Sequence, residues 1–291
     1  MDQGAELVLP TQTVTGESPV WDDVSRVLWW TDIPQKTLYR WDPSATQYST
    51  FEMPGRVGCF ALRRAGGLVL AMEQGFATWD PAGGAFVTLA QPERGLASHR
   101  FNDGRCDRQG RFIAGSMNMA RSAPSGQLWR LAADFSVTRL AGDVTIANGL
   151  AFSPDGKLMY WADSPTERVY VFDYDPDTGN IANQRLWLGP ATAPGRPDGA
   201  AIDADGCYWS ARWGGGCVVR FTPAGLVDRI VQVPVSRVTM CCFGGADLRT
   251  LYITTARENL TPDELAREPL SGGVFAIHLD VQGIAEPRFN A

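Results

Sequence analysis

Short apolar runs rich in valine, leucine, phenylalanine, tryptophan and tyrosine alternate along the chain with polar turns that contain glycine or aspartate. This alternation predicts many short β-strands joined by tight turns. Six segments share one pattern of strand, polar turn and strand. They are WDDVSRVLWW (21–30), ALRRAGGLVLA (61–71), RCDRQGRFIAG (105–115), AFSPDGKLMYW (151–161), AIDADGCYWSA (201–211) and CFGGADLRTLYIT (242–254).

The turns of these six segments recur every 40 to 50 residues. A period in the forties with about four strands in each repeat is typical of a β-propeller blade. We therefore predict an all-β protein, a six-bladed β-propeller that forms a single domain over residues 1–291. The N-terminal segment AELVLP is predicted to be an extra outer strand, which closes the ring by pairing with the last blade.

Two longer connections stand out between the predicted strands. Residues 260–269 (LTPDELAREP) carry the signals of a short helix, because Thr261 can cap it, Pro262 takes its first position and Glu264 completes a capping box. Residues 116–127 (SMNMARSAPSGQ) are mostly small and polar. We expect these connections to overhang a binding face.

Composition narrows the class of protein and of partner. Of the 291 residues, 44% are hydrophobic and 20% are charged, which predicts a globular chain with a large core. The formal net charge is -6 and no basic cluster is interleaved with aromatic residues, so we expect no nucleic-acid partner. Neither a leader nor a membrane-length apolar run is recognisable, which predicts a cytoplasmic location and no membrane partner. The expected partner is a small molecule, and the expected state is a monomer.

Cysteine and histidine usage limits the metal chemistry. The six cysteines are scattered and none forms a C-x-x-C pair, so we predict reduced core residues rather than a disulfide framework or a zinc site. Alternation along a strand would send Cys241 and Cys242 to opposite faces. The chain has only two histidines, His99 and His278, so a site built on several histidines is not expected.

Residues at the same offset in every repeat form a ring, because the first strand of each propeller blade lines the central channel. Eight residues before the turn glycine of repeats two to five lie Gly58, Asn102, Asn148 and Asp198, and Glu17 precedes the first turn by nine. The sixth repeat has VTMCC here, which predicts a thiol or a methionine. Taken singly, asparagine or aspartate before glycine is explained by turn chemistry. Four oxygen-bearing side chains on one ring favour a binding site instead.

The ring has the composition of a site for a hard divalent cation. Glu17 and Asp198 would repel one another across a narrow channel and raise one another's pKa unless a cation lay between them. Carboxylate and amide oxygens suit such an ion, and three protein ligands would leave positions open for water and substrate. An open coordination sphere is typical of a catalytic metal site in the channel. Iron(II), zinc, manganese, calcium and magnesium all stay open as the one bound ion.

Five longer motifs carry a family resemblance. They are GESPVW (16–21), RFNDGRCDRQGRFIAGSM (100–117), IANGLAFSPDGKLMYWADS (146–164), GRPDGAAIDADGCYWSA (195–211) and TMCCFGGADLRTLYITTA (239–256). In this order and at this spacing they resemble the regucalcin/gluconolactonase family of six-bladed propellers. Within that family the sequence is similar to the bacterial sugar lactonases of pentose oxidation, and the resemblance covers nearly the whole chain.

The resemblance implies one divalent metal ion held by Glu17, Asn148 and Asp198, with Asn102 close to it and Arg100 in contact with substrate. It also implies hydrolysis of a sugar lactone, which would make the protein a hydrolase of carboxylic ester bonds. The animal members of the family carry acidic residues in the loop that reads NMARSAPSG here, where there are none. Their substrate contacts in that loop are therefore not transferred to this chain.

We expect the protein to open an aldono-lactone, such as D-xylonolactone or a related pentono- or hexonolactone, to the aldonic acid in sugar catabolism. Glu17 and Asp198 are the candidate catalytic residues, and Asp198 is preferred for proton transfer. Arg100 and Asn102 are expected to donate hydrogen bonds to substrate. Asp103 is a further candidate for a substrate contact, although it can also cap its own turn.

Two interpretations without catalysis stay open. One is a propeller that binds calcium without performing chemistry, and the other is a propeller that serves as an interaction platform. The WD dipeptides at 41–42 and 79–80 do not identify WD repeats, because each precedes proline and no Gly-His partner is present. A serine hydrolase is not expected, since the chain has no G-x-S-x-G motif.

Overall fold

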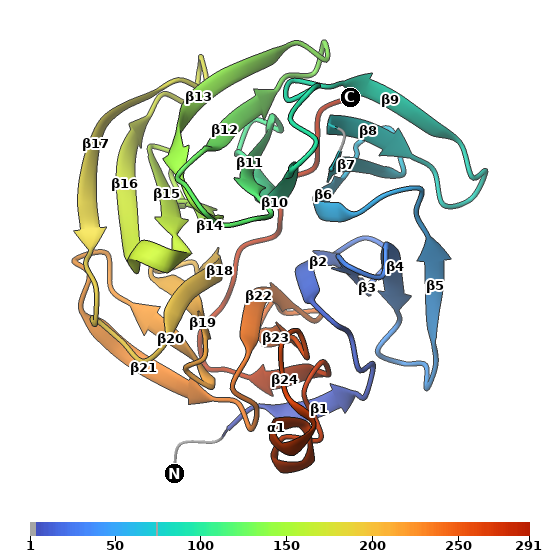
Figure 1. Ribbon diagram of the computed structural model, residues 1–291, viewed down its shortest axis with the longest axis vertical. Coiled ribbons are helices and arrows are strands. Elements are labelled where there is room, and N and C mark those ends of the chain that lie inside the picture. Colours follow the sequence, from blue (N-terminus) through green and yellow to red (C-terminus); the bar gives the residue numbers. More distant parts are fainter. Residues whose placement is uncertain (1–3, 74) are drawn as a thin grey trace.

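The computed structural model describes residues 4–73 and 75–291. Six four-stranded sheets are arranged around a common axis like the blades of a propeller (Figure 1). Neighbouring strands within a blade pair antiparallel, and the first strand of each repeat lies nearest the axis. The predicted six-bladed β-propeller is therefore confirmed.

The strands of each blade follow one another from the centre outwards. The first three blades are β2 (Gly16–Asp22), β3 (Val27–Asp32), β4 (Thr37–Trp41) and β5 (Tyr48–Glu52); β6 (Val57–Leu62), β7 (Leu68–Met72), β8 (Gly75–Trp79) and β9 (Phe86–Ala90); and β10 (His99–Cys106), β11 (Phe112–Asn118), β12 (Gly126–Leu131) and β13 (Val137–Val144). The last three are β14 (Ala147–Phe152), β15 (Leu158–Asp163), β16 (Arg168–Tyr174) and β17 (Ile181–Leu188); β18 (Arg196–Ile202), β19 (Tyr208–Trp213), β20 (Cys217–Phe221) and β21 (Val227–Gln232); and β22 (Val238–Gly244), β23 (Thr250–Thr255), β24 (Val274–His278) and β1 (Glu6–Leu9).

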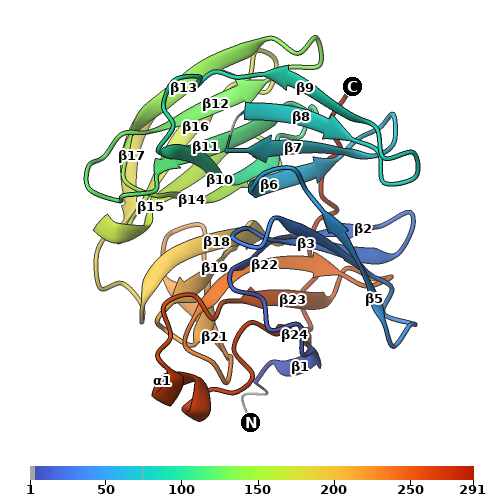
Figure 2. The ribbon, with the colours of Figure 1, turned by 45° about the vertical axis from the view of Figure 1, so that its right-hand side comes forward.

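The N-terminal strand completes the last blade. β1 pairs antiparallel with β24, with Glu6 opposite Ala276 and Leu7 opposite Phe275. Figure 2 shows β1 beside β24, at the outer edge of a sheet whose other strands come from the C-terminal part of the chain. The predicted closure of the ring by AELVLP is confirmed, and it covers an edge of β24 that would otherwise be exposed.

Apolar side chains fill the spaces between the blades, and the inner strands β6 and β14 are buried along their whole length. All six cysteines are buried and none forms a disulfide, so their predicted place in the core is confirmed. Cys241 packs in one cluster with Trp209, whereas Cys242 packs in another with Trp21. Alternation along β22 therefore sends these two thiols to opposite faces, as predicted.

The short helix also forms where the sequence predicts it. α1 (Pro262–Arg267) has Thr261 as its N-cap, and the side chains of Thr261 and Glu264 each accept a hydrogen bond from the other residue's backbone N–H. α1 projects beside the sixth blade (Figures 1 and 2). A single turn of 3-10 helix, η1 (Ser164–Thr166), follows β15. None of the helices in the described ranges is long and apolar enough to cross a bilayer.

The C-terminal segment after β24 crosses the centre of the ring (Figure 1). The N–H of Phe289 donates to the carbonyl oxygen of Leu62 at 2.8 Å, and Glu286 forms an ion pair with Arg105 of β10. Leu62 lies where the first strand of its blade turns into the second. The segment therefore covers the end of the channel opposite to the end where the inner strands begin.

Phe289 anchors this C-terminal segment, because its side chain is completely buried with Phe76 and Phe112. We expect Phe289→Ala to lower the free energy of unfolding by about 3 to 5 kcal/mol, since the lost ring leaves a cavity in a close-packed core. Phe135 has its ring 6.3 Å from that of Phe289 but is 39% exposed, so Phe135→Ala is a matched control. Denaturant unfolding measures both variants. An equal loss of unfolding free energy in the two variants would show that burial of the Phe289 ring does not add to stability.

Candidate active site

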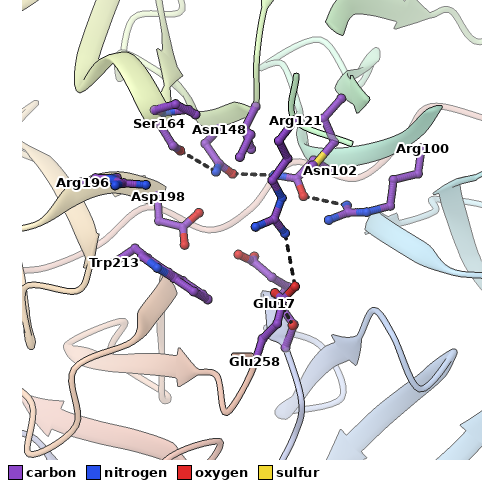
Figure 3. A pocket seen from close by; sticks show the side chains of 14 residues that line it. Glu17, Arg100, Asn102, Arg121, Asn148, Ser164, Arg196, Asp198, Trp213 and Glu258 are labelled. Atoms are coloured by element: carbon purple, nitrogen blue, oxygen red, sulfur yellow. Dashed lines mark hydrogen bonds and ion pairs between the residues drawn. The ribbon is translucent and has the colours of Figure 1, made fainter. Parts of the chain in front are cut away.

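A cavity opens at the end of the channel where the inner strands begin. Its walls come from the inner strands of four blades and from connections above them, and Figure 3 shows the side chains that point into it. The lining residues are Thr15, Glu17, Arg100, Asn102, Met117, Arg121, Ile146, Asn148, Ser164, Pro165, Arg196, Asp198, Trp213 and Glu258.

Five of the predicted site residues lie together in this cavity. They are Glu17 on β2, Arg100 and Asn102 on β10, Asn148 on β14 and Asp198 on β18. In each of these strands the pairing with the second strand of the blade shifts by one residue at this point. Such a bulge leaves one residue out of the ladder and redirects the side chains around it. The matching offsets in the sequence therefore correspond to matching bulges around one space.

A chain of hydrogen bonds orients the amide side chains of the site. Arg100 Nη1 donates to Asn102 Oδ1 at 2.6 Å, and Asn102 Nδ2 donates to Asn148 Oδ1 at 2.8 Å. Asn148 Nδ2 in turn donates to Ser164 Oγ at 2.8 Å. Asn148 Oδ1 keeps one lone pair free for a cation, because an amide oxygen accepts two hydrogen bonds.

Asn102 does not donate to substrate in this arrangement. Its Nδ2 group donates to the carbonyl oxygen of Ala147 at 2.9 Å and to Asn148 Oδ1 at 2.8 Å, which uses both of its protons. The expectation that Asn102 donates a hydrogen bond to the sugar is therefore wrong. Asn102 Oδ1, which accepts from Arg100, has one lone pair left and can accept a hydrogen bond from a sugar hydroxyl instead.

Glu17 and Asp198 are buried acids, only 5% and 7% exposed, and neither forms an ion pair with a basic side chain in the described residues. Burial raises the pKa of Glu17 to about 8, with a further contribution from the negative charge of Asp103. Burial raises the pKa of Asp198 well above its usual range, and the charge of Glu17 raises it further. The predicted repulsion between the two acids is present, and a cation between them would relieve it.

Asp103 lies outside the lining of the cavity. Its side chain is 2% exposed, and its Oδ2 accepts a hydrogen bond from the N–H of Leu150 in β14 at 2.8 Å. Burial also raises the pKa of Asp103 to about 6. A direct substrate contact does not fit this position, because the carboxylate is buried between the strands and does not face the cavity. Asp103 instead joins the third blade to the fourth.

The inner strands of the remaining two blades, β6 and β22, bring no side chain into the cavity. A Cβ atom on Gly58 would lie 2.2 Å from the carbonyl oxygen of Phe101, so the close approach of β10 requires glycine there. In the sixth blade Gly244 pairs with Thr250, which places the centre of the turn before Thr250 and moves the ring position towards Met240. Of the thiol or methionine predicted for this ring position, the structure therefore places Met240 there, outside the cavity lining and packed against β18.

Five polar residues of the cavity are not among the predicted site residues: Thr15, Arg121, Ser164, Arg196 and Glu258. Arg121 lies in the 116–127 connection that was expected to overhang a binding face, and Glu258 lies two residues before the 260–269 connection. Their side chains pair at 3.2 Å. Arg196 lies two residues before Asp198 on β18, and alternation along the strand is a signal that would have found it. Ser164 begins η1, and no pattern in the sequence connects it with Asn148.

The donor set fits a single divalent cation. The carboxylates of Glu17 and Asp198 and the amide of Asn148 point towards one shared space (Figure 3). All three side chains offer oxygen, which hard divalent ions prefer. Within residues 4–73 and 75–291, no group of three or more histidine, cysteine, aspartate or glutamate side chains is placed to hold a metal ion. A cation in this space would therefore need the amide oxygen of Asn148 as well as the two carboxylates.

Residues 15–257 match the family described as the SMP-30/gluconolactonase/LRE-like region. The chain belongs to this family. The match confirms the resemblance drawn from the five motifs, and it spans all the predicted site residues. The matched region contains every residue that lines the cavity except Glu258, which follows it directly.

Relatives in this family are similar over nearly their whole length. A 6-deoxy-6-sulfogluconolactonase from Pseudomonas putida is 44% identical over 289 residues, which make up 99% of each chain. Regucalcin from Homo sapiens is 39% identical over 288 residues, or 96% of each chain. A solved structure of regucalcin from Agrobacterium tumefaciens, described as a calcium-binding protein, has a TM-score of 0.95 at 29% identity and matches 99% of this chain and 98% of that one.

Proposed function

We propose that this protein is a metal-dependent sugar lactonase that hydrolyses an aldono-lactone to the aldonic acid. The observation that carries the proposal is the pair of buried carboxylates, Glu17 and Asp198, which face one cavity with no basic partner among the described residues. Membership of the SMP-30/gluconolactonase/LRE-like family supports it, and so does the 44% identity to a relative named as a sulfogluconolactonase.

Lactone hydrolysis needs a polarised carbonyl group, an attacking water and a proton for the departing ring oxygen. Glu17, Asn148 and Asp198 would hold a divalent ion, which would supply Lewis acidity for the lactone carbonyl. The Asp198 carboxylate takes a proton from the water as the water oxygen bonds to the carbonyl carbon. The same proton passes to the ring oxygen when the bond between that oxygen and the carbonyl carbon breaks. The product is the open-chain aldonic acid, and Asp198 is returned to its starting state.

Arg100 is the group that contacts the substrate from β10. Its Nη1 donates to Asn102 Oδ1 and to the carbonyl oxygen of Phe101, which fixes the guanidinium at the cavity wall. Burial lowers the pKa of Arg100 to about 10, so the side chain stays protonated at neutral pH. Its other N–H groups can donate to a sugar hydroxyl or to the negative charge that develops on the carbonyl oxygen.

Acid release from a panel of aldono-lactones tests the proposal. The panel contains D-xylonolactone and other pentono- and hexonolactones, and each is assayed after chelation and after re-addition of calcium, magnesium, manganese, zinc or iron(II). We expect chelation to abolish hydrolysis and at least one metal to restore it. Turnover that does not respond to the chelator would refute the metal-dependent mechanism. D-Xylonolactone as substrate, a place in xylose catabolism, a cytoplasmic location and a monomeric state stay predictions.

A second candidate function is binding of calcium without chemistry. The similarity to a structure described as a calcium-binding protein favours it. The same experiment separates the two functions, because a protein that binds one divalent ion but hydrolyses no lactone in the panel would be a metal-binding propeller. Hydrolysis that requires the ion would exclude that alternative.

Asn148→Asp is expected to keep the metal ion and to lower kcat by about 10- to 100-fold. A third negative ligand reduces the Lewis acidity of the ion, on which polarisation of the carbonyl depends. The change also removes the Nδ2 donor to Ser164 Oγ, so Ser164→Ala is the matched control that breaks this bond without adding charge. Calorimetric metal titration and lactonase kinetics measure the two effects. Equal or faster turnover in Asn148→Asp would contradict this role for a neutral ligand.

A further inference from the structure

The arginine side chains of the cavity differ in how they are paired. Arg100 donates to Asn102, and Arg121 forms an ion pair with Glu258 at 3.2 Å. Arg196 is exposed at the mouth of the cavity, and its side chain makes no hydrogen bond or ion pair with any residue of the described ranges. One permanent positive charge at the mouth is thus left for a ligand.

Arg196 lies beside the groups to which the proposed function assigns the chemistry. It precedes Asp198 by two residues on β18 and pairs across the sheet with Trp213 of β19. Figure 3 shows Arg196 on the same side of the cavity as Asp198, with the indole of Trp213 next to them. Arg196 and Trp213 line both the cavity and the wider groove that continues outwards from it. A ligand whose reacting end lies at Asp198 can therefore extend past Arg196.

None of the acidic residues near the mouth forms an ion pair with Arg196 among the described residues. Glu258 pairs with Arg121. Glu264 accepts hydrogen bonds within the capping box of α1, and Glu167 Oε2 accepts one from the N–H of Ala191 at 3.2 Å. The N–H groups of Arg196 are therefore not used by these side chains and stay free to donate to a ligand.

A second cation strengthens the positive character of this side. The guanidinium of Arg237 lies 5.1 Å from the centre of the Trp213 ring, and Arg237 lines the same outer groove. A cation over an aromatic face keeps its charge while the ring holds it in place. The wall formed by Arg196, Trp213 and Arg237 is thus positively charged and adjoins the site of hydrolysis.

We propose that Arg196 recognises an anionic group on the substrate, a sulfonate, phosphate or carboxylate at the end of the sugar remote from the lactone carbonyl. Guanidinium groups bind such anions through paired N–H donors, and these charge-assisted bonds are among the strongest available to a side chain. The inference rests on the proposed lactonase function and names its substrate class. Arg196 sets specificity in this account and takes no part in the chemical step.

Matched lactones test the inference with the metal-loaded enzyme. Gluconolactone is compared with its 6-deoxy-6-sulfo and 6-phospho derivatives, in the wild type and in Arg196→Gln, Arg196→Lys and Arg64→Gln. Arg64 is exposed in a turn at the opposite end of the channel, so it controls for loss of an arginine charge. We expect the wild type to prefer at least one anionic lactone in kcat/KM, and Arg196→Gln to reduce that preference by about 10- to 100-fold, mainly through KM. Arg196→Lys should retain part of the preference, and Arg64→Gln all of it.

A binding measurement supplies a readout that does not depend on turnover. Calorimetry should show that the 6-sulfonated open-chain acid binds the wild type more tightly than gluconate does, and that Arg196→Gln removes most of this difference. Equal kcat/KM for neutral and anionic lactones in the wild type would overturn the inference and leave the lactonase function standing. An Arg196→Gln variant that keeps the full preference for anionic lactones would overturn the inference in the same way. Failure to hydrolyse any of the lactones would refute the proposed function itself.

Discussion

Replacing Asp198 with asparagine is expected to lower kcat/KM for lactone hydrolysis by at least about 1,000-fold, because an amide cannot accept the proton of the attacking water. The variant also loses one of the two negative ligands, so its affinity for the divalent ion should fall. Asparagine has nearly the same shape as aspartate, and relief of a buried acid with a raised pKa favours folding of the metal-free chain. Steady-state kinetics, calorimetric metal titration and thermal unfolding measure the three effects.

Asp103→Asn is the matched control for this prediction. Asp103 is also a buried aspartate, but it lies outside the cavity lining and accepts a hydrogen bond from Leu150 that an asparagine oxygen can accept as well. We expect this variant to bind the ion and to keep at least about one-tenth of the wild-type rate. Full activity in Asp198→Asn, or equal losses in the two variants, would contradict the assignment of Asp198.

The metal-free protein is expected to lose stability as the pH rises from about 5 to about 8. Glu17 has its pKa raised from 4.5 to about 8 in the folded chain, because burial and the charge of Asp103 disfavour ionisation. The unfolded chain gives up this proton at lower pH, so stability that is present below pH 4.5 is lost progressively until the folded carboxyl ionises near pH 8. The free energy of unfolding falls by up to about 1.4 kcal/mol per pH unit for this one group.

Denaturant unfolding at a series of pH values, with and without a saturating divalent ion, measures this effect. In the metal-free protein, Glu17→Gln should reduce the fall of the free energy of unfolding between pH 5 and 8. In the wild type, the bound ion should abolish the part of this fall that is due to Glu17. Glu258→Gln is the control, because Glu258 lies in the same cavity but is paired with Arg121. A slope that is the same in Glu17→Gln as in the wild type would show that Glu17 does not titrate in this way.

The sequence predicted the blades well because each blade carries its own local signals. A turn with glycine or aspartate between two apolar strands recurs in every repeat, and this signal does not depend on distant parts of the chain. The C-terminal segment shows the limit of such signals. Its backbone bonds, such as that from Phe289 to Leu62, join positions far apart in the sequence, and no local pattern marks them.

Some residues of the site could be predicted from the sequence, and others could not. Glu17, Asn148 and Asp198 could be found because equivalent bulges put equivalent residues around the axis. Arg121 and Glu258 could not, since they are 137 residues apart and meet only through the paths of two connections. The hydrogen-bond partners within the site also could not be predicted from the sequence. That both Nδ2 protons of Asn102 are used follows only from the positions of its neighbours.

The dependence of lactone hydrolysis on bound metal is the most direct test of whether Glu17, Asn148 and Asp198 hold a catalytic ion. Metal-free protein is titrated with the divalent ion that best supports turnover, and the initial rate is measured together with the number of ions bound per chain. We expect the rate to rise in proportion to occupancy and to reach its maximum at one ion per chain. Glu17→Gln should shift this curve to higher metal concentration. Full hydrolysis with no ion bound would contradict a metal-dependent mechanism.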